Sequence, residues 1–189
     1  MACDLRDRLR NGFRWTDPGD GTDFVVSDRS GWWRDAIVIR DIGRALGELF
    51  TGMSPTVVLA PEVTGFLLGP LVANALGVGF VEAYRAGARR PIAEPMTWAE
   101  VPADHRGDRQ HLGVRTSLLS PADRVLVVDD WAATGAQARA LHDLVRTLGA
   151  TPIGTAVIVD ECPPEVAAEL SIRGLLTGAD LGDLPAVAE

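Results

Sequence analysis

The sequence predicts an α/β fold built on a doubly wound, mainly parallel sheet flanked by helices. Short apolar runs alternate along the chain with stretches of helical periodicity. The runs around Val57, Val125 and Val157 are apolar throughout, as expected of strands covered on both faces. At 189 residues the chain has the length of one domain with a sizeable core. Ligands bind such sheets outside the carboxyl ends of the strands, so we expect the functional cleft there.

The expected elements follow one another in a regular order. Apolar residues close to helical spacing predict a first helix from about 34 to 50, and a β-rich run at 56–60 predicts the first strand. A helix is expected next over 65–77, with the bond lost at Pro70 compensated by neighbouring contacts. The remaining elements are a strand at 78–85, a polar stretch at 86–112, a strand at 124–130, a helix at 136–148 and a strand at 153–160.

We predict one domain over residues 1–189, with the α/β core at about 34–171. Residues 1–33 and the tail at 172–189 fall outside the strand-helix alternation and are expected to pack together as a small cap. The polar stretch from about 86 to 112 is too long for an ordinary connection. It is expected to form either a flexible loop that acts as a lid or a hairpin of its own.

Composition indicates a small anionic ligand. The formal charge of −8 argues against non-specific nucleic-acid binding, yet arginines gather locally between 85 and 109. No apolar run approaches the roughly 18 residues of a membrane span, and the N-terminus lacks the apolar middle of a signal peptide. Cys3 and Cys162 have neither metal-ligand nor redox spacing. We therefore expect a cytoplasmic protein with reduced thiols and without nucleic-acid or membrane partners.

The segment RVLVVDDWAATGAQ at 124–137 carries the chemistry. Asp129 and Asp130 end an apolar strand, where paired acids need a hydroxyl, a metal or a cation as partner. The small turn that follows enters a helix and offers backbone N–H groups to an anion, while Thr134 adds a hydroxyl and Gly135 permits close approach. This pattern predicts a phosphate seat beside ribose hydroxyls. The alternative is that the acids cap the helix or pair with an arginine.

VLVVDDWAATGAQ resembles the 5-phosphoribosyl 1-pyrophosphate (PRPP) signature of type I phosphoribosyltransferases. PEVTGFLLGPLVANALGVGFVEAYRAG is most similar to the adenine phosphoribosyltransferases, and the resemblance covers about 23–160. It implies that Asp129 and Asp130 bind the ribose hydroxyls in catalysis, together with Arg85. Mg²⁺ would be chelated by PRPP near these acids, without direct protein ligands. The resemblance also places the 5-phosphate among Ala133, Thr134, Gly135, Ala136 and Gln137.

Several positions depart from the family pattern. Thr64 stands where adenine-using relatives carry an arginine that contacts pyrophosphate, so Arg85 is the expected replacement cation. Gln137 replaces the usual second threonine, which keeps a donor but changes its reach. The pyrophosphate turn then consists of Glu62, Val63, Thr64 and Gly65, together with Arg85.

Two further regions depart from the relatives near the base and in the loop. Val26 and Trp131 are expected beside the base, with Trp131 as a stacking platform or, alternatively, packed under the helix. In the loop, His105, Arg106 and Arg109 are candidates to cover the leaving pyrophosphate. The alternative for the histidine is simple solvation.

The expected function is Mg-dependent transfer of a 5-phosphoribosyl group from PRPP to a purine or purine-like base, as in purine salvage. A ring nitrogen attacks C1 and pyrophosphate leaves, so orientation and stabilisation of the leaving charge are the protein's main tasks. Relatives are usually dimers, and a homodimer is expected. A non-catalytic regulator that senses PRPP or a nucleotide is the main alternative, and hydrolysis or synthesis at a nucleotide is a third.

Overall fold

The computed structural model describes residues 2–19, 24–87, 92–102 and 110–182. Within these residues, seven strands form one sheet in the order β5-β6-β4-β3-β7-β8-β9. Its parallel part consists of β4 (Gly79–Arg85), β3 (Val57–Pro61), β7 (Arg124–Ala132), β8 (Thr151–Asp160) and β9 (Ile172–Thr177). At one edge, β6 (Gln110–Arg115) pairs antiparallel with both β4 and β5 (Met96–Val101). The predicted mainly parallel sheet is confirmed.

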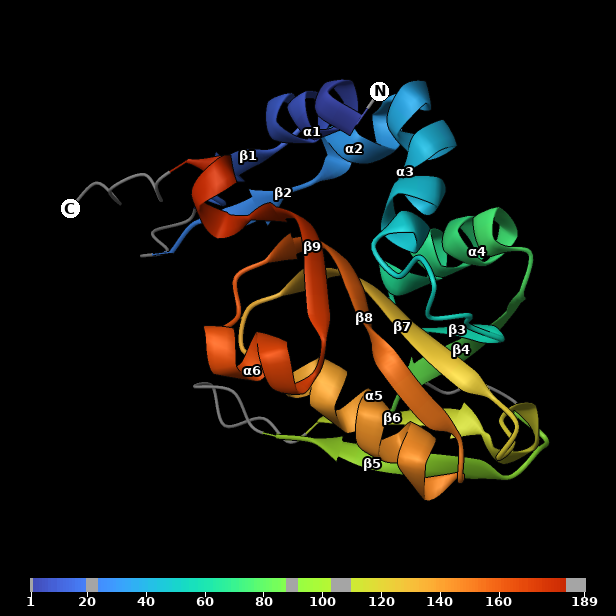
Figure 1. Cartoon of the computed structure of the whole chain (residues 1–189). Helices are drawn as coiled ribbons and strands as arrows, with labels where there is room; N and C mark the ends of the chain where they lie inside the picture. Colours follow the sequence, from blue (N-terminus) through green and yellow to red (C-terminus); the bar gives the residue numbers. More distant parts are fainter. Residues whose placement is uncertain (1, 20–23, 88–91, 103–109, 183–189) are drawn as a thin grey trace.

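Helices cover both faces of this sheet (Figure 1). Helices α3 (Ala36–Glu48) and α4 (Gly65–Leu76) lie on one face, and α5 (Ala136–Thr147) lies on the other. The strand period of two divides the core accordingly, since Leu126 and Val128 face α3 and α4 whereas Val125 and Val127 face α5. The short helix α6 (Pro164–Glu169) packs beside β9. Both faces of the central strands are therefore buried, as their apolar sequences predict.

Local chemistry sets the ends and the spacing of the helices. Asp35 accepts a hydrogen bond from the Ile37 backbone N–H at 2.8 Å, so α3 begins at Ala36 behind an N-cap. Helix α4 continues through Pro70, as expected. A Cβ atom at Gly43 would lie 2.3 Å from the Leu71 carbonyl oxygen, so only glycine lets α3 and α4 approach this closely.

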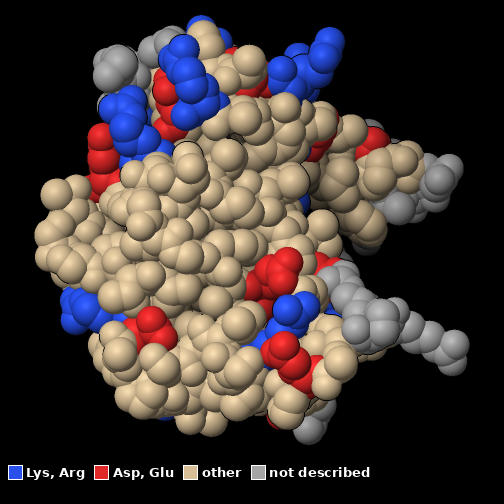
Figure 2. All heavy atoms as spheres, turned by 90° about the vertical axis from the view of Figure 1, so that its right-hand side faces the viewer, with Lys and Arg blue, Asp and Glu red and all other residues tan. Residues whose placement is uncertain are grey.

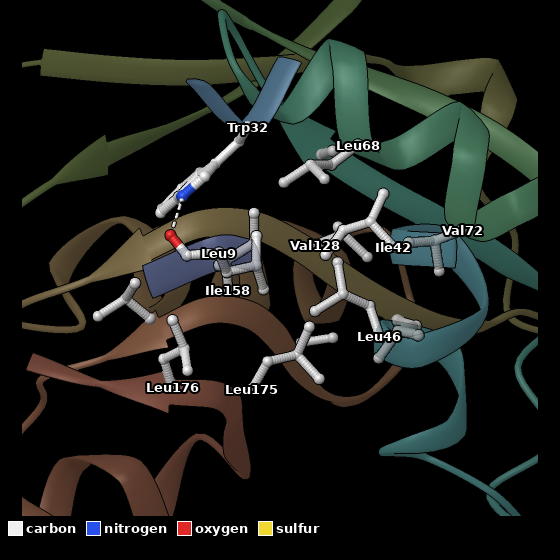
Figure 3. Close-up of a cluster of buried hydrophobic side chains, with 14 of the residues drawn as sticks. Leu9, Trp32, Ile42, Leu46, Leu68, Val72, Val128, Ile158, Leu175 and Leu176 are labelled. Atoms are coloured by element: carbon white, nitrogen blue, oxygen red, sulfur yellow. Dashed lines mark hydrogen bonds between the residues drawn. The ribbon is translucent and has the colours of Figure 1, made fainter. Parts of the chain in front are cut away.

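The N-terminal residues form a cap over one end of the sheet (Figure 1). It contains α1 (Ala2–Asn11), the antiparallel pair β1 (Arg14–Thr16) and β2 (Val26–Asp28), and α2 (Ser30–Arg34). Trp32 is fully buried and its indole N–H donates to the Leu9 carbonyl oxygen at 2.7 Å (Figure 3). This core is continuous with Ile42, Leu68 and Val128, which fixes the cap on the sheet. The helix expected to be first is therefore the third, because α1 and α2 precede it.

The predicted cap boundary at 172 is wrong. Residues 172–177 form β9, which extends the main sheet beside β8, and Ile172, Leu175 and Leu176 are buried there. By pairing with the open edge of β8, this apolar strand forms backbone hydrogen bonds and buries more apolar surface than it would in a cap. The turn η2 (Gly178–Leu181) does reach the cap, where Arg10 pairs with Asp180 at 2.6 Å. Residues 183–189 lie outside the described residues.

The described part of the polar stretch forms a hairpin, one of the two expected alternatives. Strands β5 and β6 pair from Met96 with Arg115 to Val101 with Gln110, and Leu112 and Val114 pack in the same core as α5. Residues 88–91 and 103–109 are not described. The turn η1 (Thr116–Leu118) leads on toward β7.

Within the described ranges, no helix has both the length and the apolar character needed to cross a bilayer.

Candidate active site

Asp129 and Asp130 lie inside β7, which continues past the predicted end at 130 because Trp131 and Ala132 still pair with β8. Both acids are largely buried, with 9% and 6% of their surface exposed. Consecutive strand side chains face opposite sides, and the two carboxylates do so here. Asp129 accepts from the Gln137 side-chain amide at the start of α5, whereas Asp130 pairs with Arg29 of the cap.

The environment of Asp129 disfavours its charged form. Burial, and then the neighbouring charge of Asp130, raise the pKa of Asp129 well above the usual carboxyl value. Hydrogen bonds from the Asp130 backbone N–H, at 2.9 Å, and from Gln137 oppose that increase. A buried carboxyl of this kind can accept a hydrogen bond from a ligand hydroxyl. Its protonation state depends on which hydrogen-bond donors surround it.

The turn after β7 has the shape expected of an anion seat. Gly135 is the N-cap residue of α5 with φ of 72°, and a Cβ atom there would lie 2.5 Å from Val166 Cγ1. Glycine is required at this position for both reasons. Ala133 and Thr134 are exposed at the helix N-terminus, and the Thr134 hydroxyl accepts from the Ala136 backbone N–H at 3.3 Å. The helix dipole and the terminal N–H groups of α5 favour a negative ligand here.

Arg85 stands at the end of β4 and faces the turn between β3 and α4. Its Nε donates to the Glu62 carbonyl oxygen at 3.0 Å, and its backbone N–H donates to the Glu62 carboxylate at 3.1 Å. The peptide bond between Glu62 and Val63 is cis. Val63 is 69% exposed and Gly65 is buried at the first turn of α4, with Thr64 half-buried between them. Arg85 and this turn therefore belong to one region, as the sequence predicts.

Two adjoining cavities lie along this edge of the sheet. One, of about 90 Å³, is lined by Asp129, Trp131 and the turn after β7. The other, of about 250 Å³, is lined by Arg85 and Gln110 together with the first residues of α5. Thr134, Ala136 and Gln137 line both cavities. The predicted phosphate turn is thus the wall shared by the cavity beside Asp129 and the cavity beside Arg85.

The residues expected beside the base come from the cap side. Trp131 packs against Phe13 and Trp15, with ring centroids 5.7 and 6.0 Å apart, and its indole N–H donates to Glu161 at 3.0 Å. Its ring is half-buried at the strand end, where it lines the smaller cavity. Val26 is 40% exposed on β2. Their contact with a base remains a prediction.

Sequence reasoning missed Arg29, Gln110 and His142. Arg29 could not be identified because the cap sequence shows no helical or strand periodicity, and nothing in it indicates that Arg29 contacts Asp130. Gln110 accepts from Arg85, a contact that depends on the β5-β6 hairpin. His142 is buried on α5, where its Nε2 lies 3.0 Å from Thr155 Oγ1 of β8, a contact between two elements that the helical pattern alone does not reveal. The loop candidates His105, Arg106 and Arg109 lie outside the described residues.

The described residues provide no group of three or more His, Cys, Asp or Glu side chains suited to hold a metal. Asp129 and Asp130 already accept hydrogen bonds from Gln137 and Arg29. These residues fit a Mg²⁺ ion carried by the oxygens of a bound ligand and do not fit a complete protein cage.

Cys162 donates weakly to the Ala132 carbonyl oxygen at 3.4 Å, and burial raises the pKa of its thiol to about 11, so it is not an activated nucleophile.

A doubly wound sheet with paired acids and an anion turn at its carboxyl edge defines a type I phosphoribosyltransferase. The family model of the phosphoribosyl transferase domain matches residues 35–167, and the chain belongs to this family. The match confirms the predicted family, the fold class and the class of enzyme.

Individual relatives agree with this assignment. The chain is 35% identical over 156 residues to an adenine phosphoribosyltransferase of Methylococcus capsulatus, covering 82% of this chain and 86% of the relative. It is 46% identical over 103 residues to one from Nocardioides, spanning 54% of this chain and about half (53%) of that relative. An adenine phosphoribosyltransferase from Trypanosoma brucei, solved with AMP, pyrophosphate and ribose-5-phosphate, has the same fold with a TM-score of 0.78 at 23% identity, covering 98% of this chain and 84% of that one.

Proposed function

We propose that this protein transfers the 5-phosphoribosyl group of PRPP to a ring nitrogen of a purine base and releases pyrophosphate. The observation that carries the proposal is the wall of Thr134, Ala136 and Gln137, which separates the compartment of Asp129 from that of Arg85. A ligand with its 5-phosphate on this wall would have its ribose beside Asp129 and its pyrophosphate beside Arg85. The relatives' activity toward adenine supports a purine acceptor.

The chain's own groups divide the work of such a transfer. The N-terminus of α5 holds the 5-phosphate, and Asp129 and Asp130 accept hydrogen bonds from the ribose hydroxyls. Positive charge develops on the ribose as the bond to pyrophosphate breaks, so nearby carboxylates stabilise the ring while Arg85 stabilises the leaving oxygens. Mg²⁺ bound to the pyrophosphate would add a Lewis acid for that leaving group. The base is held in line with C1 by the cap and Trp131.

The decisive experiment measures pyrophosphate release from PRPP and Mg²⁺ with the full chain across adenine, guanine, hypoxanthine and xanthine. Turnover with one or more of these bases supports the proposal and names the acceptor. Binding of PRPP without release for any base supports the second candidate, a PRPP-sensing regulator. That candidate is favoured by the half-buried, uncharged Thr64 in the turn where the family resemblance implies a cation. A chelator control shows whether release needs Mg²⁺.

A homodimer and a cytoplasmic location are further parts of the proposal. Helix α4 carries no charged residue; Val63, two residues before it, is 69% exposed and Leu67 in its first turn is 52% exposed. Figure 2 shows a broad area without charged side chains on the face that carries this helix. A second copy of the chain covering that area would remove apolar surface from water. Sedimentation of wild type and Leu67→Glu tests this, with a dimer expected only for the wild type.

A further inference from the structure

Gln137 lies between the proposed ribose acid and the proposed pyrophosphate cation. Its Oε1 accepts from the Arg85 guanidinium at 2.7 Å, and its Nε2 donates to the Asp129 carboxylate. Gln137 is half-buried in the first turn of α5, whereas its two partners come from β4 and β7. One side-chain amide therefore joins groups that are 44 positions apart in sequence, from 85 to 129.

The orientation of this amide follows from the chemistry of its partners. A guanidinium has only donors, so the amide oxygen must face Arg85 and the NH₂ group is left for Asp129. A donor directed at a carboxyl group stabilises its ionised form. Gln137 thus opposes the effect that burial and Asp130 have on Asp129.

Arg85 is held from three directions by described residues. Its Nε donates to the Glu62 carbonyl oxygen, and its two terminal nitrogens donate to Gln110 and Gln137. A guanidinium has five N–H groups, so these contacts leave donors for an anionic ligand in the larger cavity. Loss of one contact would free the long side chain to adopt other rotamers, at an entropic cost to any ligand that must order it again.

We propose that Gln137 is a positioning residue of the transfer reaction, which couples the ribose-binding half of the site to the pyrophosphate-binding half. The inference rests on the proposed use of PRPP. A shorter side chain such as threonine has neither the length nor the separate amide donor and acceptor to join Asp129 and Arg85. The longer glutamine gives this chain a connection that compensates for Thr64 by fixing the alternative cation.

The first test measures the titration of the Asp129 carboxyl carbon by ¹³C NMR in the full chain, with Asp129→Asn used to assign the signal. Gln137→Leu should raise the titration midpoint by about one to two pH units, from the usual strength of a hydrogen bond to a charged group. Gln137→Glu should raise it at least as far, because it places another negative charge beside Asp129. Gln110→Leu is the matched control, since it removes an amide contact to Arg85 without touching Asp129. An unchanged midpoint in Gln137→Leu, or an equal shift in Gln110→Leu, overturns the role.

The second test measures coupling through PRPP affinity. With Gln137 present, Arg85→Met and Asp129→Asn are each expected to weaken PRPP binding. The Kd of the double variant should differ by about fivefold or more from the value obtained by multiplying the two single effects, as expected of groups in one network. In the Gln137→Leu background the two effects should become multiplicative. Multiplicative effects in both backgrounds overturn the coupling. Failure of the wild type to bind PRPP rejects the proposed function instead, and the NMR result separates the two failures.

Discussion

The Arg29 guanidinium donates to the Asp130 carboxylate, which ties the cap to the end of β7. The Asp130 side chain is 8% exposed and that of Arg29 is 31% exposed. The cap is attached to the same strand a second time through Trp131, which packs on Phe13 and Trp15. The cap therefore cannot move as a unit without disturbing an acid of the site.

Arg29→Met should destabilise the fold by about 1 to 2 kcal/mol, between the values typical of exposed and buried ion pairs. The cost arises because Asp130 is left buried without its cation. Urea unfolding at pH 7 measures it, with Arg34→Met, an exposed arginine of the same cap, as control. Equal and small effects of both changes would show that the pair contributes little.

Asp130→Asn should weaken PRPP binding by roughly tenfold, because a charged acceptor for a ribose hydroxyl becomes a neutral one. The amide oxygen of the variant still accepts from Arg29, so unfolding should change less than in Arg29→Met. Calorimetric titration of PRPP at fixed Mg²⁺ gives the affinity. Unchanged affinity with a large fall in Tm would assign Asp130 to structure alone.

Arg85→Ala should raise the KM for PRPP by about tenfold or more, since it removes the cation that faces the pyrophosphate turn. Adding Thr64→Arg should restore part of the loss by returning a cation to the start of α4. Steady-state kinetics with saturating base measure both variants. If neither substitution has an effect, pyrophosphate binds elsewhere.

Trp131→Ala should weaken base binding by roughly one to two orders of magnitude, the usual contribution of one stacked base, while PRPP affinity is retained. Titration of each base against tryptophan fluorescence, with calorimetry for the variant, measures the change. Glu161→Gln is the control, because it alters the partner of the indole N–H and keeps the ring in place. A loss of stability with normal base affinity would mean that the indole only packs against Phe13 and Trp15.

The contribution of His142 to stability should fall as the pH drops below neutrality, in opposition to that of Asp129, whose raised pKa favours the folded state at lower pH. Burial lowers the pKa of this histidine from 6.5 to about 4, so the unfolded chain binds its proton more readily than the folded one. The contribution is complete above pH 6.5 and is lost as the pH falls from there toward 4. Between pH 7 and pH 5 the loss should be about 2 kcal/mol. Urea unfolding of the wild type and of His142→Gln, which does not titrate here, isolates this contribution: the stability of the wild type relative to the variant should fall by that amount from pH 7 to pH 5, and an unchanged difference would contradict it.

The local sequence pattern was sufficient to predict those parts of the fold whose structure depends on residues close together in the chain. Apolar runs identified β3, β7 and β8 because strands buried on both faces have no polar side to interrupt them. The glycine and small residues before Ala136 identified the anion turn, since its geometry depends on Gly135 and on the helix that follows. The segment at 172–177 was misassigned because a strand at a sheet edge looks, in sequence alone, like any short apolar run.

Only the tertiary structure decided what each side chain of the site contacts. The sequence presents Asp129 and Asp130 as a pair, but the strand period sends one toward α5 and the other toward the cap. Their partners Gln137 and Arg29 lie 8 and 101 positions away, and no local propensity encodes such distances. The sequence by itself therefore determined the central strands of the sheet, the turn and the family. The packing of the cap, the hairpin and α5 around one sheet edge determined which donors hold the acids, because hydrogen bonds between distant residues exist only once the chain has folded.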